Sequence, residues 1–503
     1  MKTKGYKVIG IIEKALLFTA LISAVVGSSI YLYINRELFN YFSVMIIIFS
    51  MLLLLMLFGV FYSFVCQKEN TKSTKLLNFI IAFLAVCVGI YIIVFQLILD
   101  LFQPFSIFAP PIICFALFLF AYGVSAILGF FKSKNTKALS LVGIAFLGII
   151  LLNVIWASTQ DYAKFNENIP SKIVFEKGEG DYATYRIPTL LMMENKGKNQ
   201  EDALVVFTEA RCHTAVDKSE SELVTKTSLD GGKTFTEMQV ALTPTEIFGS
   251  VGRIADPTPV YDKIRNKICL LFIAGTKQNK YKLSPYYMEG VLQTDGSILW
   301  DKENVVDMSK KVDFIFSAGP SKGTQLSDGT LAFPIRHNGQ NFVLYTNDGG
   351  NTFTKGESAG KGGEVDMDTL SDTELVLITR TGNMSIFPRN IHLHFAYSND
   401  NGQTWTRKTS PTTLRTPSVM SSVTSYDNRI YVAYADSFLT RANLSYAVSK
   451  DKGETWETIP LYTGASGYAV GDASSDGKYY IIAEMGKVEY HEEIRLFTVD
   501  ARV

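Results

Sequence analysis

The 503-residue sequence predicts an all-β six-bladed β-propeller, preceded by an all-α transmembrane domain of five helices. Three observations support this fold class: an uneven charge distribution, long apolar stretches without charge, and a repeated turn motif. Basic and acidic residues number 48 each, which argues against a nucleic-acid-binding protein because such proteins carry a basic excess. However, residues 1–160 hold 11 basic and 4 acidic residues, and residues 161–503 hold 37 and 44. We therefore expect two chemically different parts, 1–160 and 161–503.

The first part contains five stretches without a charged residue. About 20 apolar residues suffice for a helix to cross a bilayer. A buried core helix could account for one such stretch but not for five, and a cleaved signal peptide would not be followed by further spans. The expected helices cover about 10–35, 38–67, 76–102, 106–131 and 138–158.

Lysines in alternate loops give an orientation for this anchor. They precede the first span, separate spans two and three, and separate spans four and five. The positive-inside rule places these loops in the cytoplasm, and an odd number of spans places residues 161–503 outside the cell. We therefore expect a multi-pass plasma-membrane protein with the lipid bilayer as a partner. No ionisable side chain lies in mid-span, so we expect no ion pathway.

The second part contains short β-type runs separated by Gly, Asn and Asp turns, which predicts an all-β domain. A pattern Ser/Thr-x-Asp-x-Gly-x-Thr-aromatic occurs four times, at Ser228–Phe235, Thr346–Phe353, Ser398–Trp405 and Ser449–Trp456. The aspartates are separated by 118, 52 and 51 residues, and a degenerate copy with Asp295 and Trp300 lies in the long gap. Repeats of this length, made of short strands, predict six propeller blades of four strands each.

The repeated motif is expected to be structural. Its aspartate can accept hydrogen bonds from turn amides, its glycine can adopt a positive φ, and its aromatic ring can pack between sheets. Five cysteines are too few for a disulfide framework, although one bridge between Cys212 and Cys269 is left open. The histidines show no zinc-ligand spacing, and we expect no metal and no cofactor.

The four motifs, preceded by Tyr185-Arg186-Ile187-Pro188, resemble the bacterial exo-α-sialidase (neuraminidase) family with Asp-box repeats. The resemblance covers about residues 170–503. It implies a six-bladed sialidase-like propeller that needs no catalytic metal.

Further segments follow in the order of that family. Phe207–Arg211, Gly319–Leu326 and Arg441-Ala442-Asn443-Leu444-Ser445 resemble its landmarks. The resemblance implies Tyr468 as nucleophile, Glu364 as its base and Asp217 as acid/base. It also implies Arg186, Arg380 and Arg441 as the carboxylate-binding arginines. Supporting residues are Glu484, which would orient Arg186, and Arg211 and Asp256, which would contact the ring substituents.

These residue types suit a substrate that carries a carboxylate on the reacting carbon. Guanidinium groups form paired hydrogen bonds with carboxylates, so three arginines would bind the sugar's negative charge. A carboxylate nucleophile would be repelled by that charge, whereas a neutral phenol activated by a general base would not. Sialidases are the tyrosine exception among glycosidases that otherwise use paired carboxylates.

The expected function is hydrolysis of terminal sialic acid from glycoconjugates with retention, through a covalent sialyl-enzyme intermediate. Sialylated glycans would be the substrates. A trans-sialidase of the same fold, a non-catalytic glycan-binding Asp-box propeller and a relative acting on another acidic sugar remain as alternatives.

Overall fold

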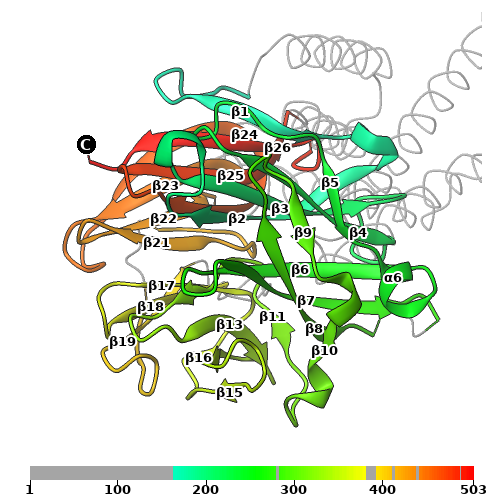
Figure 1. Cartoon of the computed structure of the whole chain (residues 1–503). Coiled ribbons are helices and arrows are strands. Elements are labelled where there is room, and N and C mark those ends of the chain that lie inside the picture. The colour runs from blue at the N-terminus through cyan, green and yellow to red at the C-terminus, as the bar shows by residue number, and fades with distance from the viewer. Residues whose placement is uncertain are drawn as a thin grey trace, which may run out of the picture. The chain divides into compact units, whose positions relative to one another are not determined.

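The computed structural model describes residues 163–502, apart from residues 279–281, 381–391, 410–413, 438–440 and 488. They belong to one compact unit, Ala163–Val503, shown in Figure 1. Strands make up nearly all of its regular structure, and α6 (Pro244–Phe248) is the single α-helix among the described residues. The described fold is therefore all-β.

The expected fold class needs correction in one part, the all-α transmembrane domain. None of the helices in residues 163–502 is long and apolar enough to span a bilayer, so an all-α transmembrane domain of five helices is no part of the described fold. The five expected spans, within residues 1–160, lie outside the described residues. Apolar, uncharged runs indicate that residues avoid water, but this pattern alone does not determine which element they form.

The strands and short helices follow one another as β1 (Ser171–Glu176), η2 (Glu179–Asp181), β2 (Thr184–Met193), η3 (Lys198–Gln200), β3 (Ala203–Arg211), β4 (Ser221–Ser228), β5 (Gln239–Leu242), α6 (Pro244–Phe248), β6 (Gly252–Asp262), β7 (Lys267–Thr276), β8 (Ser284–Leu292), β9 (Ile298–Trp300), η4 (Lys302–Asn304), β10 (Val306–Asp307), η5 (Met308–Lys310), β11 (Ser317–Ala318), β12 (Thr324–Gln325), β13 (Leu331–His337), β14 (Gln340–Thr346), β15 (Thr354–Lys355), β16 (Gly360–Lys361), β17 (Val365–Thr369), β18 (Leu375–Thr379), β19 (His394–Ser398), β20 (Thr406–Thr409), β21 (Ser422–Tyr426), β22 (Arg429–Ala435), β23 (Ala442–Ser449), β24 (Glu457–Ala473), β25 (Lys478–Gly486) and β26 (Glu493–Asp500).

Antiparallel pairing groups these strands into six consecutive units, which we call blades I to VI. The long strand β24 belongs to two of them, because residues up to Ala465 pair with β23 and residues from Ala465 onward pair with β25. The blades are, in order, β2–β5, β6–β10, β11–β16, β17–β20, β21–β23 with the first half of β24, and the second half of β24 with β25, β26 and β1.

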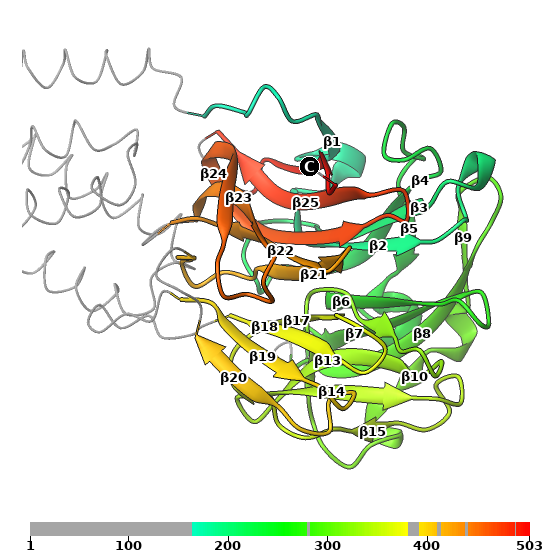
Figure 2. The ribbon, with the colours of Figure 1, turned by 90° about the vertical axis from the view of Figure 1, so that its left-hand side faces the viewer.

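The last blade joins the two ends of the described chain. Strand β1 pairs with β26, with Ser171 opposite Phe497 and Glu176 opposite Glu493, and the two lie side by side in Figure 1. The ring is thereby closed by hydrogen bonds between its first and last strands. Figure 2 shows the neighbouring blades from the side. Closure removes open sheet edges inside the ring.

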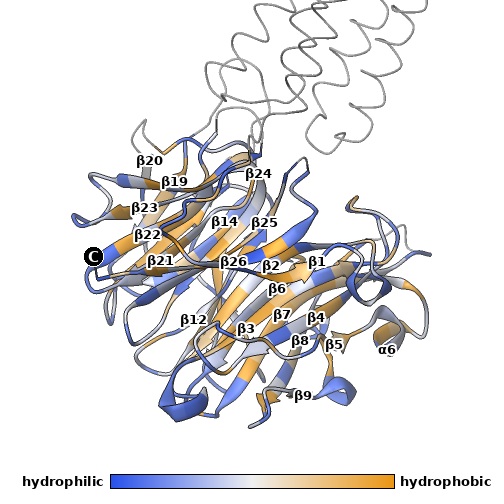
Figure 3. Cartoon of the chain, turned by 90° about the horizontal axis from the view of Figure 1, so that it is seen from above, coloured by the Kyte–Doolittle hydropathy of each residue, from blue (hydrophilic) through white to orange (hydrophobic). Residues whose placement is uncertain are grey.

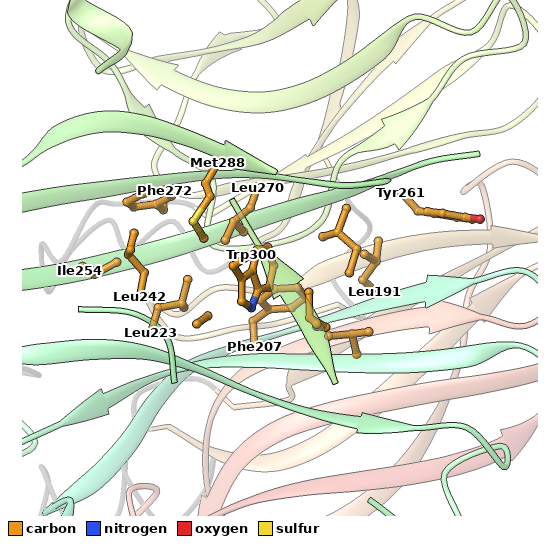
Figure 4. Packing of buried hydrophobic residues seen from close by; sticks show 14 of the residues in the cluster. Leu191, Phe207, Leu223, Leu242, Ile254, Tyr261, Leu270, Phe272, Met288 and Trp300 are labelled. Atoms are coloured by element: carbon orange, nitrogen blue, oxygen red, sulfur yellow. The ribbon is translucent and has the colours of Figure 1, made fainter. Parts of the chain in front are cut away.

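Apolar clusters fill the space between neighbouring blades. Between blades I and II, Phe207 and Leu223 face Leu270 and Phe272, as Figure 4 shows. Leu270 and Phe272 lie on one face of β7. The opposite face of β7 is also covered, because Leu271 packs in the cluster between blades II and III. Strands buried on both faces explain the continuous apolar run of β7. Figure 3 shows apolar residues along the strands and polar residues in many of the connecting turns.

The repeated motif is structural, as predicted from the sequence. In the first copy, Asp230 accepts hydrogen bonds from the amide and hydroxyl of Thr234, and Ser228 accepts one from the Gly232 amide. Gly232 has a φ of 80°, which suits glycine. The motif aromatics Trp405 and Trp456 pack against clusters between blades. Ser474, Asp476 and Gly477 form a further turn of this kind, which the sequence pattern missed.

Cys212 and Cys269 are both free, so the bridge left open by the sequence does not form in the structure.

Candidate active site

Bulges in the inner strands of the blades aim polar side chains toward one region. The pairing of β2 with β3 is interrupted just after Arg186, where Ile187 has a φ of 55°. The pairing of β23 with β24 is interrupted after Ala442, and that of β24 with β25 between Ser466 and Ala469. A positive φ is costly for a β-branched residue, so Ile187 is strained where its strand changes direction. Bulges of this kind commonly redirect side chains near functional sites.

Tyr468, on β24, shares a hydrogen-bonded group with Glu364 and Arg380. Its hydroxyl donates to Oε1 of Glu364 at 2.7 Å, and Arg380 donates to that hydroxyl at 3.1 Å. The Arg380 guanidinium also binds the second oxygen of Glu364 at 2.6 Å. Glu364 precedes β17 and Arg380 follows β18, and the Arg380 amide donates to the Glu364 carbonyl. Neighbouring strands of blade IV thus present the Glu364 carboxylate and the Arg380 guanidinium side by side.

The environment keeps Tyr468 protonated and Glu364 ionised. Burial raises the pKa of Tyr468 well above its usual value, and the negative charge of Glu364 raises it further. Burial alone would raise the pKa of Glu364, but Arg380 and the Tyr468 hydroxyl outweigh it and hold that pKa below its usual range. A neutral phenol therefore faces a carboxylate that can accept its proton.

Arg186 is held by a fully buried carboxylate. Its Nε lies 2.7 Å from Oε1 of Glu484, and the side chains are 1% and 0% exposed. Glu484, on β25, also accepts hydrogen bonds from the amides of Ile187 and Tyr468. One carboxylate therefore connects the strand that carries Arg186 with the strand that carries Tyr468.

Three arginines surround the Tyr468 side chain. The guanidinium carbons of Arg186 and Arg441 lie 6.0 and 5.4 Å from the centre of its ring, and Arg380 binds its hydroxyl. Ser418 connects two of them, because its hydroxyl accepts from Arg380 and its carbonyl accepts from Arg441. Arg441 keeps one buried Nε without a hydrogen-bond partner in the described part of the chain. The cluster is suited to an anionic ligand.

Tyr490 covers two of these arginines. Its ring centre lies 5.3 Å from the guanidinium carbon of Arg186 and 5.1 Å from that of Arg441. Its hydroxyl accepts a hydrogen bond from Arg441 at 3.1 Å. The ring face offsets part of the crowded positive charge. The adjacent His491 is kept neutral, because burial and then Arg186 and Arg441 lower its pKa.

A second group, centred on Glu209, adjoins the first. This buried carboxylate binds Arg211 at 3.0 Å and Arg253 at 3.3 Å, and accepts a hydrogen bond from the Asp256 amide. Arg211 and Arg186 both donate to the carbonyl of Ala215, which links the two groups.

Asp217 lies at the exposed side of this second group. Its Oδ1 is 3.0 Å from Arg211, while 62% of its side chain is open to solvent. Partial burial would raise the pKa of Asp217, but the charges of Arg211, Arg186 and Arg253 lower it to about 2. In the absence of a ligand, Asp217 is therefore ionised at neutral pH.

The pKa of Asp256 is shifted in the opposite direction from that of Asp217. Asp256 has a positive φ of 54° beside a bulge between Ala255 and Thr258. Burial, and then the negative charge of Glu209, raise the pKa of Asp256 to about 8. Its carboxyl group is therefore largely protonated at neutral pH and can donate a hydrogen bond.

The structure thus brings the nine sequence-predicted site residues into two adjoining groups. The first contains Tyr468, Glu364, Arg380, Arg441, Arg186 and Glu484, and the second contains Arg211, Asp217 and Asp256. Sequence reasoning missed Glu209, Ser418 and Tyr490. Glu209 could have been found, because it lies two residues before Arg211 on one strand and so shares its face. The sequence around Ser418 and Tyr490 carries no comparable signal.

Within residues 163–502 and their stated gaps, no group of three or more His, Cys, Asp or Glu side chains is arranged to hold a metal ion.

Comparison with known proteins agrees with this architecture. A family model described as a BNR repeat-like domain matches residues 250–481. A sialidase from Bacteroides fragilis (strain YCH46) is 26% identical over 312 residues, covering 56% of this chain and 55% of that protein. A sialidase from Clostridium perfringens is 22% identical over 197 residues, covering 34% of this chain and 48% of that protein. The chain therefore spans about half the length of these relatives.

Solved structures share the fold at low identity. The Hadza microbial sialidase Hz136 has a TM-score of 0.55 at 20% identity, covering 66% of this chain and 68% of that one. The Trypanosoma rangeli sialidase in complex with 2,3-difluorosialic acid has a TM-score of 0.54 at 17% identity, covering 67% and 60%. The chain is thus similar to BNR repeat-like domains and to sialidases in sequence, and it shares the fold of the solved sialidase structures.

Proposed function

We propose that this chain, a relative of the BNR-repeat sialidases, is an exo-α-sialidase that hydrolyses terminal sialic acid from glycoconjugates. The reaction proceeds with retention through a covalent intermediate on Tyr468. The main support is the hydrogen bond of 2.7 Å from the Tyr468 hydroxyl to Glu364, formed inside a cluster of three arginines. A phenol, a base and an anion-binding cluster at one point match a sugar that carries its charge on the reacting carbon.

The three arginines would bind the sugar carboxylate. Arg186 and Arg441 approach Tyr468 from blades I and V, and Arg380 approaches from blade IV. Among the described residues the Nε of Arg441 has no hydrogen-bond partner, which favours an incoming acceptor because leaving a buried charged donor unpaired is costly. Glu484 keeps Arg186 oriented before the substrate arrives. Asp256 and Arg211 would contact the ring substituents.

In the first step, Glu364 removes the proton from Tyr468 as the phenolic oxygen attacks the anomeric carbon. The bond to the glycosidic oxygen breaks, and Asp217 gives that oxygen a proton. In the second step, Asp217 takes a proton from water, which attacks the same carbon from the vacated side. The bond to Tyr468 breaks, and the proton held by Glu364 returns to the phenolate. A sialidase from Trypanosoma rangeli with this fold is described as a covalent intermediate with 2,3-difluorosialic acid.

The low pKa of Asp217 in the free chain implies that the substrate creates the acid. A bound sialic acid brings a negative charge next to Arg186, whose positive charge helps to lower that pKa. The substrate also covers the exposed side of Asp217. Added negative charge and desolvation both raise the pKa of a carboxyl group, so Asp217 gains its proton as the complex forms.

The direct test is turnover of a 4-methylumbelliferyl sialoside by the full-length chain. Release of the fluorophore, together with sialic acid of retained configuration observed by NMR, is the expected result. Release without free sialic acid, accompanied by sialyllactose when lactose is added, would indicate a transferase. Saturable binding of sialyllactose without any release would indicate a binding propeller and would overturn the proposal.

A further inference from the structure

A buried lysine forms ion pairs with two aspartates, and a third aspartate, Asp366, belongs to the same cluster. The side chain of Lys322 is 4% exposed, and its Nζ lies 3.3 Å from Oδ2 of Asp368 and 3.6 Å from Oδ1 of Asp472. Lys322 belongs to blade III, Asp368 to blade IV and Asp472 to blade VI. One ammonium group therefore links blades that are not all neighbours in sequence.

The segment that carries Lys322 is packed tightly against blade IV. Ser321 donates a hydrogen bond of 2.8 Å to the carbonyl of Val365. A Cβ atom at Gly319 would collide with the same carbonyl oxygen, so only glycine permits this approach. The position of the lysine is thus set by backbone contacts, and the ammonium group is pre-positioned.

Each aspartate also binds the backbone of the next blade. Asp366 accepts from the Val423 amide at 2.9 Å, and Asp368 accepts from the Ser425 amide at 2.8 Å. Asp472 accepts from the Met192 amide at 3.1 Å. These bonds join blade IV to blade V and blade VI to blade I. The lysine therefore completes a set of polar links between the inner strands.

The same strands carry the reacting groups. Asp366 and Asp368 alternate along β17, and Glu364 directly precedes that strand at the same spacing, so the three share a face with about 7 Å between successive members. Tyr468 and Asp472 are both on β24. Lys322 consequently links the strand that follows Glu364 to the strand that carries Tyr468, and these two residues form the 2.7 Å hydrogen bond.

The cluster is short of positive charge. Its titratable members are Lys322, Asp366, Asp368 and Asp472, with the Tyr479 phenol nearby. Oδ1 of Asp366 is buried without a hydrogen-bond partner in the described part of the chain. Burial raises the pKa of Asp366 to about 7 and also raises the pKa of Asp472. Without the ammonium, the buried carboxylate of Asp366 and the partly buried carboxylates of Asp368 and Asp472 would repel one another.

We propose that Lys322 is a positioning residue, which fastens the inner strands of blades III, IV and VI and so sets the distance between Glu364 and Tyr468. This inference rests on the proposed function for its kinetic consequence. Its structural consequence, the anchoring of β17 and β24, is independent of that function. The two consequences are tested separately.

The first experiment measures amide hydrogen exchange in the full-length chain carrying Lys322→Met, which keeps side-chain length and removes charge. Peptides from β17 and β24 should exchange at least about 10-fold faster than in the wild type, because their link is lost. The matched control is Lys226→Met, which removes another largely buried lysine, paired with Glu179. It should leave exchange in β17 and β24 unchanged. Equal exchange in wild type and Lys322→Met would overturn the proposal, whatever the activity of the protein.

The second experiment measures kcat and KM with the aryl sialoside. Lys322→Met should lower kcat by about 10- to 100-fold and change KM by less than about 3-fold, because small misplacements of reacting groups are costly. Lys322→Arg should recover part of kcat, and Lys226→Met should keep it. Unchanged kcat in Lys322→Met would contradict the proposal. An equal loss of kcat in Lys322→Met and Lys226→Met would contradict it as well.

A third variant guards against simple misfolding. Lys322→Met combined with Asp472→Asn removes one charge of each sign, so it should be more thermostable than Lys322→Met alone while kcat stays low. Full recovery of kcat in this variant would mean that charge balance, not fastening, is the role of Lys322. An inactive wild type would refute the proposed function, and the exchange experiment alone would then decide the role of Lys322.

Discussion

The Tyr468 hydroxyl donates a hydrogen bond of 2.7 Å to Glu364, although 104 residues separate the two in sequence. The bond joins an inner strand of blade VI to one of blade IV. Arg380 donates a hydrogen bond to each of the two residues. Because Glu364 is held ionised and Tyr468 neutral, the proton already lies on the path that nucleophilic activation requires.

Tyr468→Phe should abolish turnover with little effect on folding. The substitution removes the attacking oxygen but leaves the ring and the ion pair between Glu364 and Arg380. The rate should fall by a factor of about 10³ or more, since loss of a nucleophile removes the covalent route. Tyr431→Phe is the matched control, because its buried hydroxyl donates to the Ala501 carbonyl far along the chain. The control should keep full activity, and wild-type turnover by Tyr468→Phe would return Tyr468 to a packing role.

Asp217→Ala should impair natural substrates more than aryl substrates. A sugar alkoxide needs a proton as it leaves, whereas 4-methylumbelliferone leaves readily without one. General acid catalysis is worth about 10²–10⁴-fold, so the sialylation rates for the two substrates should diverge by a measurable factor. Rapid mixing should also show a burst of aryl product, because the same residue activates water later. Equal losses of rate on both substrates would indicate lost binding. No loss of rate would assign the acid/base role to another carboxylate, and Glu220 would be the next residue to substitute.

Glu484→Gln should weaken both the fold and substrate binding. It removes one charge from a pair in which both side chains are buried, and such losses typically cost about 3–5 kcal/mol of unfolding free energy. Arg186 would lose its orientation, so KM should rise. Glu493→Gln is the control, because Glu493 pairs with Arg495 in a more exposed position. It should lower stability less and leave KM unchanged. Denaturant unfolding and steady-state kinetics measure the two effects.

Stability should depend on Asp256 in a pH-dependent manner. Its pKa is about 8 in the folded chain, above the usual value of a carboxyl group, so the folded state keeps a proton that the unfolded state releases. This contribution is present in acid and is lost as the pH rises toward and through 8. Asp256→Asn mimics the protonated form at every pH. Relative to the wild type, its melting temperature should be higher at pH 9 than at pH 5 by about 2–4 °C. A constant difference would show that Asp256 does not titrate this way.

Residues 161–503 should fold and act alone, whereas a chain that begins at residue 178 should not. The longer form keeps β1, whose pairing with β26 closes the ring, and keeps the bridge from Phe165 to Tyr462. The shorter form exposes the edge of β26 and loses Val174 and Phe175 from the core between blades VI and I. We expect a sharp cooperative melt and aryl-sialoside turnover only from the longer form. Similar melting of both would show that β1 is dispensable.

The repeated turns could be predicted from sequence because their interactions are local. Asp230, Asp348, Asp400 and Asp451 each bind groups within four residues, so the spacing of the motif is also its structure. The sixth turn, at Ser474, escaped the pattern because it lacks the threonine and the usual aromatic position. The expected transmembrane domain of five helices is not part of the fold of residues 163–502, where no helix is long and apolar enough to span a bilayer.

The roles expected at the site came from a family resemblance, and the sequence determined only the residue types and their order. Tertiary structure decided which of them meet. Tyr468 reaches Glu364 across the ring, whereas Asp217 turns to Arg211 and solvent. It also decided the contacts of Tyr490 and Ser418, which carry no sequence signal, and those of Lys322, whose segment Gly319–Leu326 stands out in the sequence without a role for the lysine. The physical reason is that bulges and blade closure set side-chain directions through hydrogen bonds between strands far apart in the chain, and burial then sets the pKa of each group.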